Sequence, residues 1–170
     1  MAAEHKIGDF VTYRQNGICR INKIVKQNFA GMGEREYFEL SPVYDMKTVI
    51  FVPLDSEPLK AGMRHILSKE EIDGIINEAE HEELEWSNDT KDRAQKFGDI
   101  LLEGDRAKIL WVIKVLSIYK KELEEKKRKL YASDAKILST AEKAITEEFS
   151  FVLGIKREEV LPYILEKIGK

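Results

Sequence analysis

The sequence predicts an α+β protein of two domains, a small bent β-sheet or barrel followed by an all-α domain of about five helices. Residues 7–52 hold short β-rich runs separated by turn residues, which is typical of a small, strongly bent sheet. From Ser68 onward, apolar residues recur with the period of amphipathic helices. At 170 residues the chain is long enough for two such cores. We therefore expect a β domain at 1–55, a connector at 56–67 and a helical domain at 68–170.

The β domain is expected to contain a series of short strands, each ended by Gly, Asn or Pro. Asn16-Gly17 is a strong hairpin signal, because both residues readily adopt the positive φ that a tight turn needs. Pro53 stops the last run, which is the richest in β-branched residues. In chain order, the expected strands are 7–13, 18–27, 36–40 and 48–52.

The helical domain is expected to begin with a capping box, in which the side chains of Ser68 and Glu71 each bind the other's backbone amide. A loop over 82–88 separates the first two helices. Residues 109–119 are apolar on nearly every side, so their helix is predicted to lie among the others. Further candidate N-caps are Asn88 or Asp89, Asp105 and Ser133.

Trp86 stands outside the periodic segments, in a polar and charged stretch, whereas Trp111 lies in the apolar helix and is expected to be core. An exposed Trp86 ring would stack on, or wedge against, a flat partner, with Lys91 and Lys96 near enough to neutralise phosphates. Alternatively, the ring folds back over the next helix and packs on Phe97 or Leu84. The residue pattern alone leaves both interpretations open.

The charge of the chain changes sign near Trp86. Residues 70–85 carry eight acidic side chains and no Lys or Arg, whereas residues 91–129 carry twelve Lys or Arg against seven Asp or Glu. The whole chain has a formal charge of -3, which by itself does not indicate a nucleic-acid partner. The distribution fits a basic surface beside an acidic one, and equally fits ordinary solvated helix faces.

No set of residues indicates catalysis. The three histidines are scattered without metal-ligand spacing, and Cys19 has no histidine nearby to activate its thiol. We therefore expect no enzyme activity, no cofactor, no metal and no small-molecule substrate. The single cysteine fits a reducing compartment, and no apolar run approaches the ~18–20 residues of a membrane span. These features predict a cytoplasmic protein with no membrane partner.

A set of short motifs spans nearly the whole chain in a recognisable order. In the β region the motifs are residues 7–13, Gly17, Ile21, Ile24, residues 36–40 and Val52-Pro53. In the helical region they are Trp86-Ser87, Lys91, Gly104-Asp105, Lys108 and Ser133. In this order and spacing the chain resembles the CarD family of bacterial transcription regulators, also called the CarD/CdnL family. The β region also looks like the polymerase-binding module of the transcription-repair coupling helicase, although no helicase motif is present.

The resemblance implies a Tudor-like β domain that docks on the β subunit of RNA polymerase. It also implies a helical domain that contacts promoter DNA at the upstream edge of the transcription bubble, which would associate the protein with the nucleoid through polymerase. The family's tryptophan acts as a wedge in the minor groove there, and Trp86 is the matching residue. The implied DNA contacts are Trp86, Asn88, Lys91 and Lys96. The implied polymerase contacts are Gln27, Lys47, Val49, Ile50, Phe51 and Val52.

Some positions depart from the family pattern. Asn88 and Asp89 stand where basic residues commonly follow the tryptophan, and Phe51 and Gln27 stand where some members carry arginine. We therefore expect a less ionic polymerase contact, made by strand pairing and by Phe51, although core packing explains Phe51 equally well. The expected function is stabilisation of the promoter open complex. The alternative is a protein–protein adaptor, which the net charge of -4 over residues 68–170 (19 basic, 23 acidic) favours.

Overall fold

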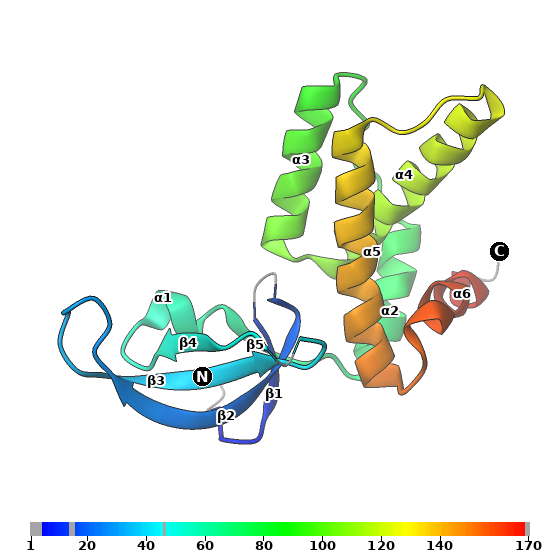
Figure 1. Ribbon diagram of the computed structural model, residues 1–170. Helices are drawn as coiled ribbons and strands as arrows, with labels where there is room; N and C mark the ends of the chain where they lie inside the picture. The colour runs from blue at the N-terminus through cyan, green and yellow to red at the C-terminus, as the bar shows by residue number, and fades with distance from the viewer. Residues whose placement is uncertain (1–4, 14–15, 46, 169–170) are drawn as a thin grey trace. The chain divides into compact units, whose positions relative to one another are not determined.

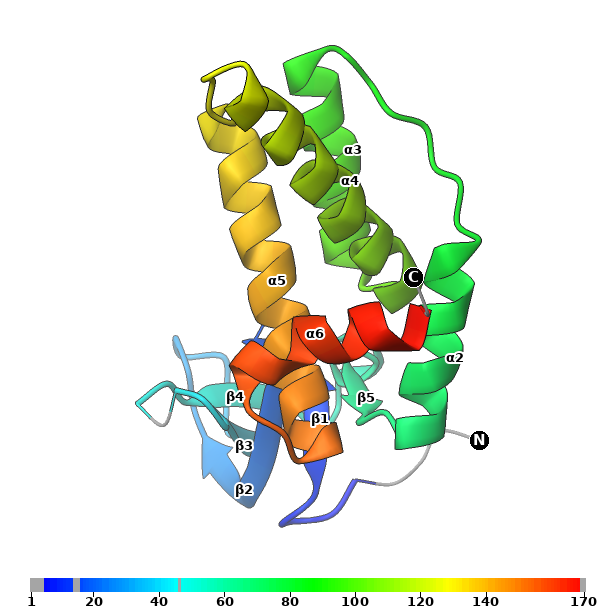
Figure 2. The ribbon, with the colours of Figure 1, turned by 90° about the vertical axis from the view of Figure 1, so that its right-hand side faces the viewer.

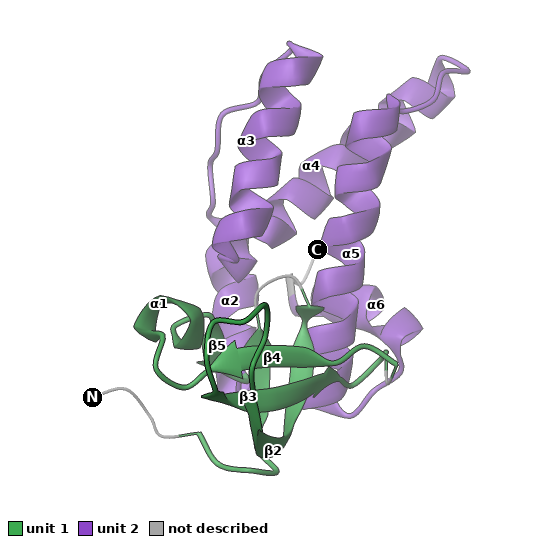
Figure 3. Cartoon of the chain, turned by 60° about the vertical axis from the view of Figure 1, so that its left-hand side comes forward, with its two compact units in different colours: residues 1–66 green, residues 67–170 purple. Residues whose placement is uncertain are grey.

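The computed structural model describes residues 5–13, 16–45 and 47–168. The chain divides into two compact units, Met1–Ile66 and Leu67–Lys170 (Figure 3). Each unit has its own cluster of buried apolar side chains. The first is a sheet and the second is helical, which confirms the predicted α+β fold class. No helix in the described part of the chain is long and apolar enough to span a membrane.

The first unit is built on a five-stranded antiparallel sheet in the order β4-β3-β2-β1-β5 (Figure 1). A bulge between Ile21 and Lys23 shifts the register of β2 against β3, and bulges bend a strand and increase its twist. Side chains alternate between the two faces of each strand, so one face supplies the core. The strands are β1 (Phe10–Tyr13), β2 (Ile18–Gln27), β3 (Arg35–Pro42), β4 (Ile50–Pro53) and β5 (Met63–His65).

Most of the segment 56–67, which we expected to be a connector, belongs to the sheet unit, and Leu67 begins the helical unit. The segment contains the short helix α1 (Glu57–Lys60), whose Leu59 packs against the core, and strand β5, which pairs with β1. Met63 is the buried residue of β5. A strand of three residues with one buried side chain is too short to show alternation, and its pairing with β1 decides its conformation.

The second unit contains five longer helices within its described residues. Helix α4 packs against α2, α3 and α5, and its residues 109–113 are all buried, as the apolar pattern predicted. Helix α6 lies across α5 and contacts α2 (Figure 2). The helices are α2 (Lys69–Glu80), α3 (Thr90–Glu103), α4 (Arg106–Glu125), α5 (Ala132–Leu153) and α6 (Arg157–Ile168).

The starts of three helices follow their local sequence. The predicted capping box of α2 is confirmed, with Ser68 Oγ accepting from the Glu71 amide at 3.1 Å and Glu71 Oε1 accepting from the Ser68 amide at 3.1 Å. Asp89, rather than Asn88, caps α3, since its carboxylate accepts from the Lys91 amide at 2.9 Å. Asp105 caps α4 as predicted.

The start of α5 differs from the prediction. Ser133 was expected to be its N-cap, but α5 begins at Ala132 and Tyr131 occupies the N-cap position without a side-chain hydrogen bond to the helix. Asp134, in the first turn of α5, is fully buried and paired with Arg93 of α3. This tertiary contact, rather than a local cap, holds the beginning of α5.

Removing the capping hydroxyl of α2 should lower stability measurably. We predict that Ser68→Ala lowers the free energy of unfolding of the helical unit by about 1 kcal/mol, because the Glu71 amide loses its acceptor. Urea unfolding followed by circular dichroism at the helical band measures this. Ser139→Ala, at an exposed position inside α5, is the matched control and should be neutral or slightly stabilising. Equal unfolding curves for the two variants would show that the capping box contributes nothing.

Candidate functional site

Trp86 lies in the irregular segment that runs from the end of α2 to the start of α3 (Figure 2). Its ring is half-buried and packs against the helical core. The ring centroid lies 6.1 Å from that of Phe97 and 5.1 Å from that of Tyr119. The predicted packing on Phe97 is therefore present, and part of the ring still reaches the surface. The two interpretations of Trp86 do not exclude each other.

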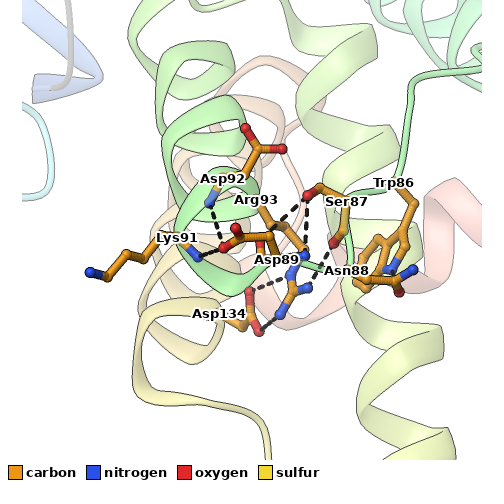
Figure 4. Close-up of polar contacts among 8 residues, drawn as sticks. All are labelled: Trp86, Ser87, Asn88, Asp89, Lys91, Asp92, Arg93 and Asp134. Atoms are coloured by element: carbon orange, nitrogen blue, oxygen red, sulfur yellow. Dashed lines mark hydrogen bonds and ion pairs between the residues drawn. The ribbon is translucent and has the colours of Figure 1, made fainter.

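The residues after Trp86 form a tight hydrogen-bonded turn (Figure 4). The Trp86 indole Nε1 donates to Asn88 Oδ1 at 3.3 Å, so Asn88 helps to orient the ring. The Asp89 amide donates to Ser87 Oγ at 3.2 Å, and the Asp89 carboxylate then caps α3. Three consecutive polar residues, Ser87 to Asp89, thus connect the tryptophan to the N-terminus of α3.

Arg93, in the first turn of α3, was not among the predicted site residues. Its side chain is 2% exposed, and its Nε and Nη2 donate to the two carboxylate oxygens of Asp134 at 2.9 and 2.5 Å. Its Nη1 donates to the Ser87 carbonyl oxygen at 2.8 Å (Figure 4). The guanidinium carbon lies 4.7 Å from the centroid of the Trp86 ring and 5.3 Å from that of Tyr119. Hydrogen bonding to Asp134 raises the pKa of Arg93 above its ordinary value, so the guanidinium stays charged.

The two predicted lysines differ in how available their charges are. Lys91 is exposed, and its side chain extends away from the Trp86 ring (Figure 4). Lys96 Nζ lies 3.1 Å from a carboxylate oxygen of Asp92 and 3.9 Å from one of Glu85. The hydrogen bond to Asp92 raises the pKa of Lys96, while hydrogen bonds from Ser87 and then Lys96 lower the pKa of Asp92. Lys96 is therefore already partly neutralised, and Lys91 is the better candidate for a phosphate contact.

Five of the six predicted polymerase contacts lie on strand β4 or just before it, and β4 is an edge strand of the sheet. Gln27 lies at the end of β2, which β3 separates from β4. Gln27, Lys47 and Val49 are exposed, with Val49 at 47%. Val52, by contrast, is fully buried in the core of the unit, and Ile50 packs against the same core. Their side chains share one face because alternate residues of a strand point to opposite faces. Val52 therefore offers only its backbone at the edge, whereas the side chain of Ile50 is half-buried.

Phe51 points to the opposite face from Val52 and joins an aromatic cluster that the sequence did not predict. Its ring centroid lies 5.2 Å from that of Phe29 and 6.3 Å from that of Tyr37. Phe29 lies in the loop after β2 and is 40% exposed, whereas Tyr37, which its ring contacts, is buried. The sequence signal that could have indicated this cluster is Phe29, an aromatic residue in a glycine-containing loop. We refer to Phe29, Tyr37 and Phe51 as the aromatic cluster.

A comparison with domain families supports the assignment of this first unit. Residues 5–67 match a family described as the CarD-like/TRCF RID domain, a span that ends within one residue of the structural boundary at Ile66. The N-terminal unit is a CarD-like/TRCF RID domain. The RID domain is an RNA polymerase-interacting domain, and the resemblance drawn from the sequence is confirmed for this part of the chain. No curated protein matches the sequence.

Cys19 lies inside the RID domain rather than at a reactive surface. Its side chain is fully buried, its Sγ lies 3.6 Å from the Gly17 carbonyl oxygen, and burial raises the thiol pKa to about 11. We predict that iodoacetamide at pH 8 alkylates Cys19 in the folded protein at least roughly a hundredfold more slowly than in urea, because the thiolate is the nucleophile. Mass spectrometry reads this single site directly. Equal rates in the two conditions would contradict the burial.

Proposed function

We propose that this protein is a non-enzymatic transcription regulator that binds the β subunit of RNA polymerase through its RID domain. Its helical unit contacts promoter DNA at the upstream edge of the bubble and stabilises the open complex, with Trp86 as the principal contact. The observation that carries the proposal is the match of residues 5–67 to the RID domain family, since it supplies the polymerase partner.

The geometry around β4 supports the polymerase contact. An edge strand offers unpaired backbone groups to an incoming strand, and exposed side chains beside it add specificity. Here the edge strand lies next to the aromatic cluster, and Val49 is exposed just before it. This arrangement favours a docking surface of strand pairing plus apolar contact, in place of arginines.

The half-buried Trp86 ring supports the DNA contact. Insertion of an apolar side chain at a base step offsets part of the few kcal/mol that unstacking costs. A ligand that binds opened DNA better than duplex DNA shifts the population toward the open complex by its differential affinity. Attachment to polymerase raises the local concentration of the helical unit, so a small contact without many free cations is sufficient.

We predict that Phe51→Asp weakens capture of RNA polymerase by the full-length protein by roughly tenfold or more, because a charge replaces an apolar contact beside the edge strand. Surface-immobilised protein and purified polymerase measure this. Arg64→Asp, an exposed residue of the opposite edge strand β5, is the control and should bind normally. Normal capture by Phe51→Asp would remove the aromatic cluster from the interface.

We predict that Trp86→Ala leaves polymerase binding unchanged and shortens the lifetime of the promoter open complex by roughly tenfold, the equivalent of about 1.4 kcal/mol of lost contact. Competitor-challenge kinetics on a promoter fragment measure the lifetime. Leu102→Ala, a 68% exposed residue at the end of α3, is the control. Because Trp86 also packs on Phe97 and Tyr119, the melting temperature of each variant is measured in parallel. An unchanged lifetime in a folded Trp86→Ala protein would refute the DNA contact.

The adaptor alternative keeps one observation in its favour, the acidic stretch at residues 70–85 together with the partial neutralisation of Lys96 by Asp92 and Glu85. Salt distinguishes it from DNA binding. The open-complex contact should weaken as salt rises, with a log-log slope of about one unit for each phosphate contacted. An adaptor would leave the open-complex lifetime unchanged at every salt concentration. It would bind its second protein through the helical unit.

A further inference from the structure

The guanidinium of Arg93 contacts both the backbone and the ring of the Trp86 segment. One nitrogen donates to the carbonyl of Ser87, the residue directly after the tryptophan, at 2.8 Å. The guanidinium itself lies 4.7 Å from the centroid of the indole. The remaining two nitrogens hold Asp134 of α5, a residue far along the chain. Arg93 therefore connects the irregular segment to a neighbouring helix.

Stability alone explains this arrangement poorly. A buried ion pair must offset the desolvation of two charges, and well-packed apolar replacements are often equally stable or more stable. Arg93 is 2% and Asp134 0% exposed, so the pair carries this cost in full. At 2% exposure the guanidinium is also unable to reach a phosphate, and Asp134 neutralises it. A direct role in binding DNA is therefore excluded for Arg93.

The Trp86 segment needs an external support because it has no regular secondary structure of its own. Residues 82–89 belong to no helix or strand. Their other side-chain polar contacts lie within the turn, as between Trp86 and Asn88, or reach the adjoining helix α3, as between Glu85 and Lys96. A contact residue raises affinity most when its conformation is set before binding, since less freedom is then lost in the complex. A planar fork with five donors suits this task better than a lysine would.

We propose that Arg93 and Asp134 form a positioning pair that holds the Trp86 ring in the orientation used for the open-complex contact. This inference rests on the proposed function. The Arg93 guanidinium fixes the Ser87 carbonyl by a hydrogen bond and lies over the indole ring, and the Tyr119 ring contacts the indole with a centroid distance of 5.1 Å. Asp134 acts through Arg93, which it holds by two hydrogen bonds.

The same unit offers a matched control. Arg106 donates to both carboxylate oxygens of Glu148 at 2.8 and 2.9 Å, and its Nη1 donates to the Gly104 carbonyl at 2.8 Å. This second pair has the same bidentate geometry, the same partner helix α5 and the same bond to a loop carbonyl. It holds the joint between α3 and α4 instead of the Trp86 segment. Removal of either pair should lower the general stability of the unit, whereas only removal of the Arg93–Asp134 pair should disturb the orientation of Trp86.

The experiment uses the full chain in a Trp111→Phe background, so that Trp86 is the sole tryptophan. We compare two double variants. The first combines Arg93→Met and Asp134→Leu and leaves no unpaired buried charge, and the second, the control, combines Arg106→Met and Glu148→Leu. The first should lower the fluorescence anisotropy of Trp86, increase its quenching by acrylamide and shorten the open-complex lifetime by roughly threefold or more. The control pair should leave all three unchanged at a temperature below both melting points. An unaltered Trp86 signal in the first variant would overturn the proposal.

Further variants separate this proposal from the function on which it rests. In a Trp86→Ala background, loss of the Arg93–Asp134 pair should cause no additional shortening of the lifetime, since the two changes remove one contact. Additive shortening would overturn a role through Trp86. If Trp86→Ala itself leaves the lifetime unchanged, the proposed function fails, while the fluorescence result still decides the positioning role. If the double variant does not fold, Arg93→Lys decides by the same readouts, because lysine keeps the charge and loses the fork.

Discussion

The helical unit depends on two buried carboxylates of α5 that neutralise arginines from two other helices. Asp134 receives Arg93 of α3, and Glu148, about four helical turns further on, receives Arg106 at the start of α4. An unpaired buried charge is strongly destabilising, so each pair restricts how its helix lies against α5. Each arginine also binds the carbonyl of a nearby loop residue, which extends the same constraint to the irregular segments beside the helices.

Trp86 shows how one side chain serves packing and recognition together. It packs against the buried Phe97 and the half-buried Tyr119, and Trp86 itself stays half-buried. A ring anchored along one side loses little freedom when a partner covers the other side. Lys96, one of the two lysines near Trp86, is paired with Asp92. This pairing is consistent with a DNA contact that depends on shape and on tethering through polymerase more than on charge.

The RID domain shows the consequence of strand alternation at a sheet edge. The side chains of adjacent residues of β4 point to opposite faces of the sheet, with Val52 in the core and Phe51 in the aromatic cluster. Position on the edge leaves the backbone of the same strand available for pairing. A single short strand thus contributes to folding through one face and presents a surface through its other face and its edge.

By itself, the sequence determined the features that depend on neighbouring residues: the division into β and helical regions, the capping box at Ser68, the cap at Asp105, a cap at either Asn88 or Asp89, and the irregular placement of Trp86. Only the tertiary structure decided the strand β5, the start of α5 without a Ser133 cap, the aromatic cluster, and the Arg93–Asp134 pair behind Trp86. Local propensity and periodicity act over a few residues, whereas these features join residues far apart in the chain. Their energies come from burial and charge pairing that exist only once the elements have packed together.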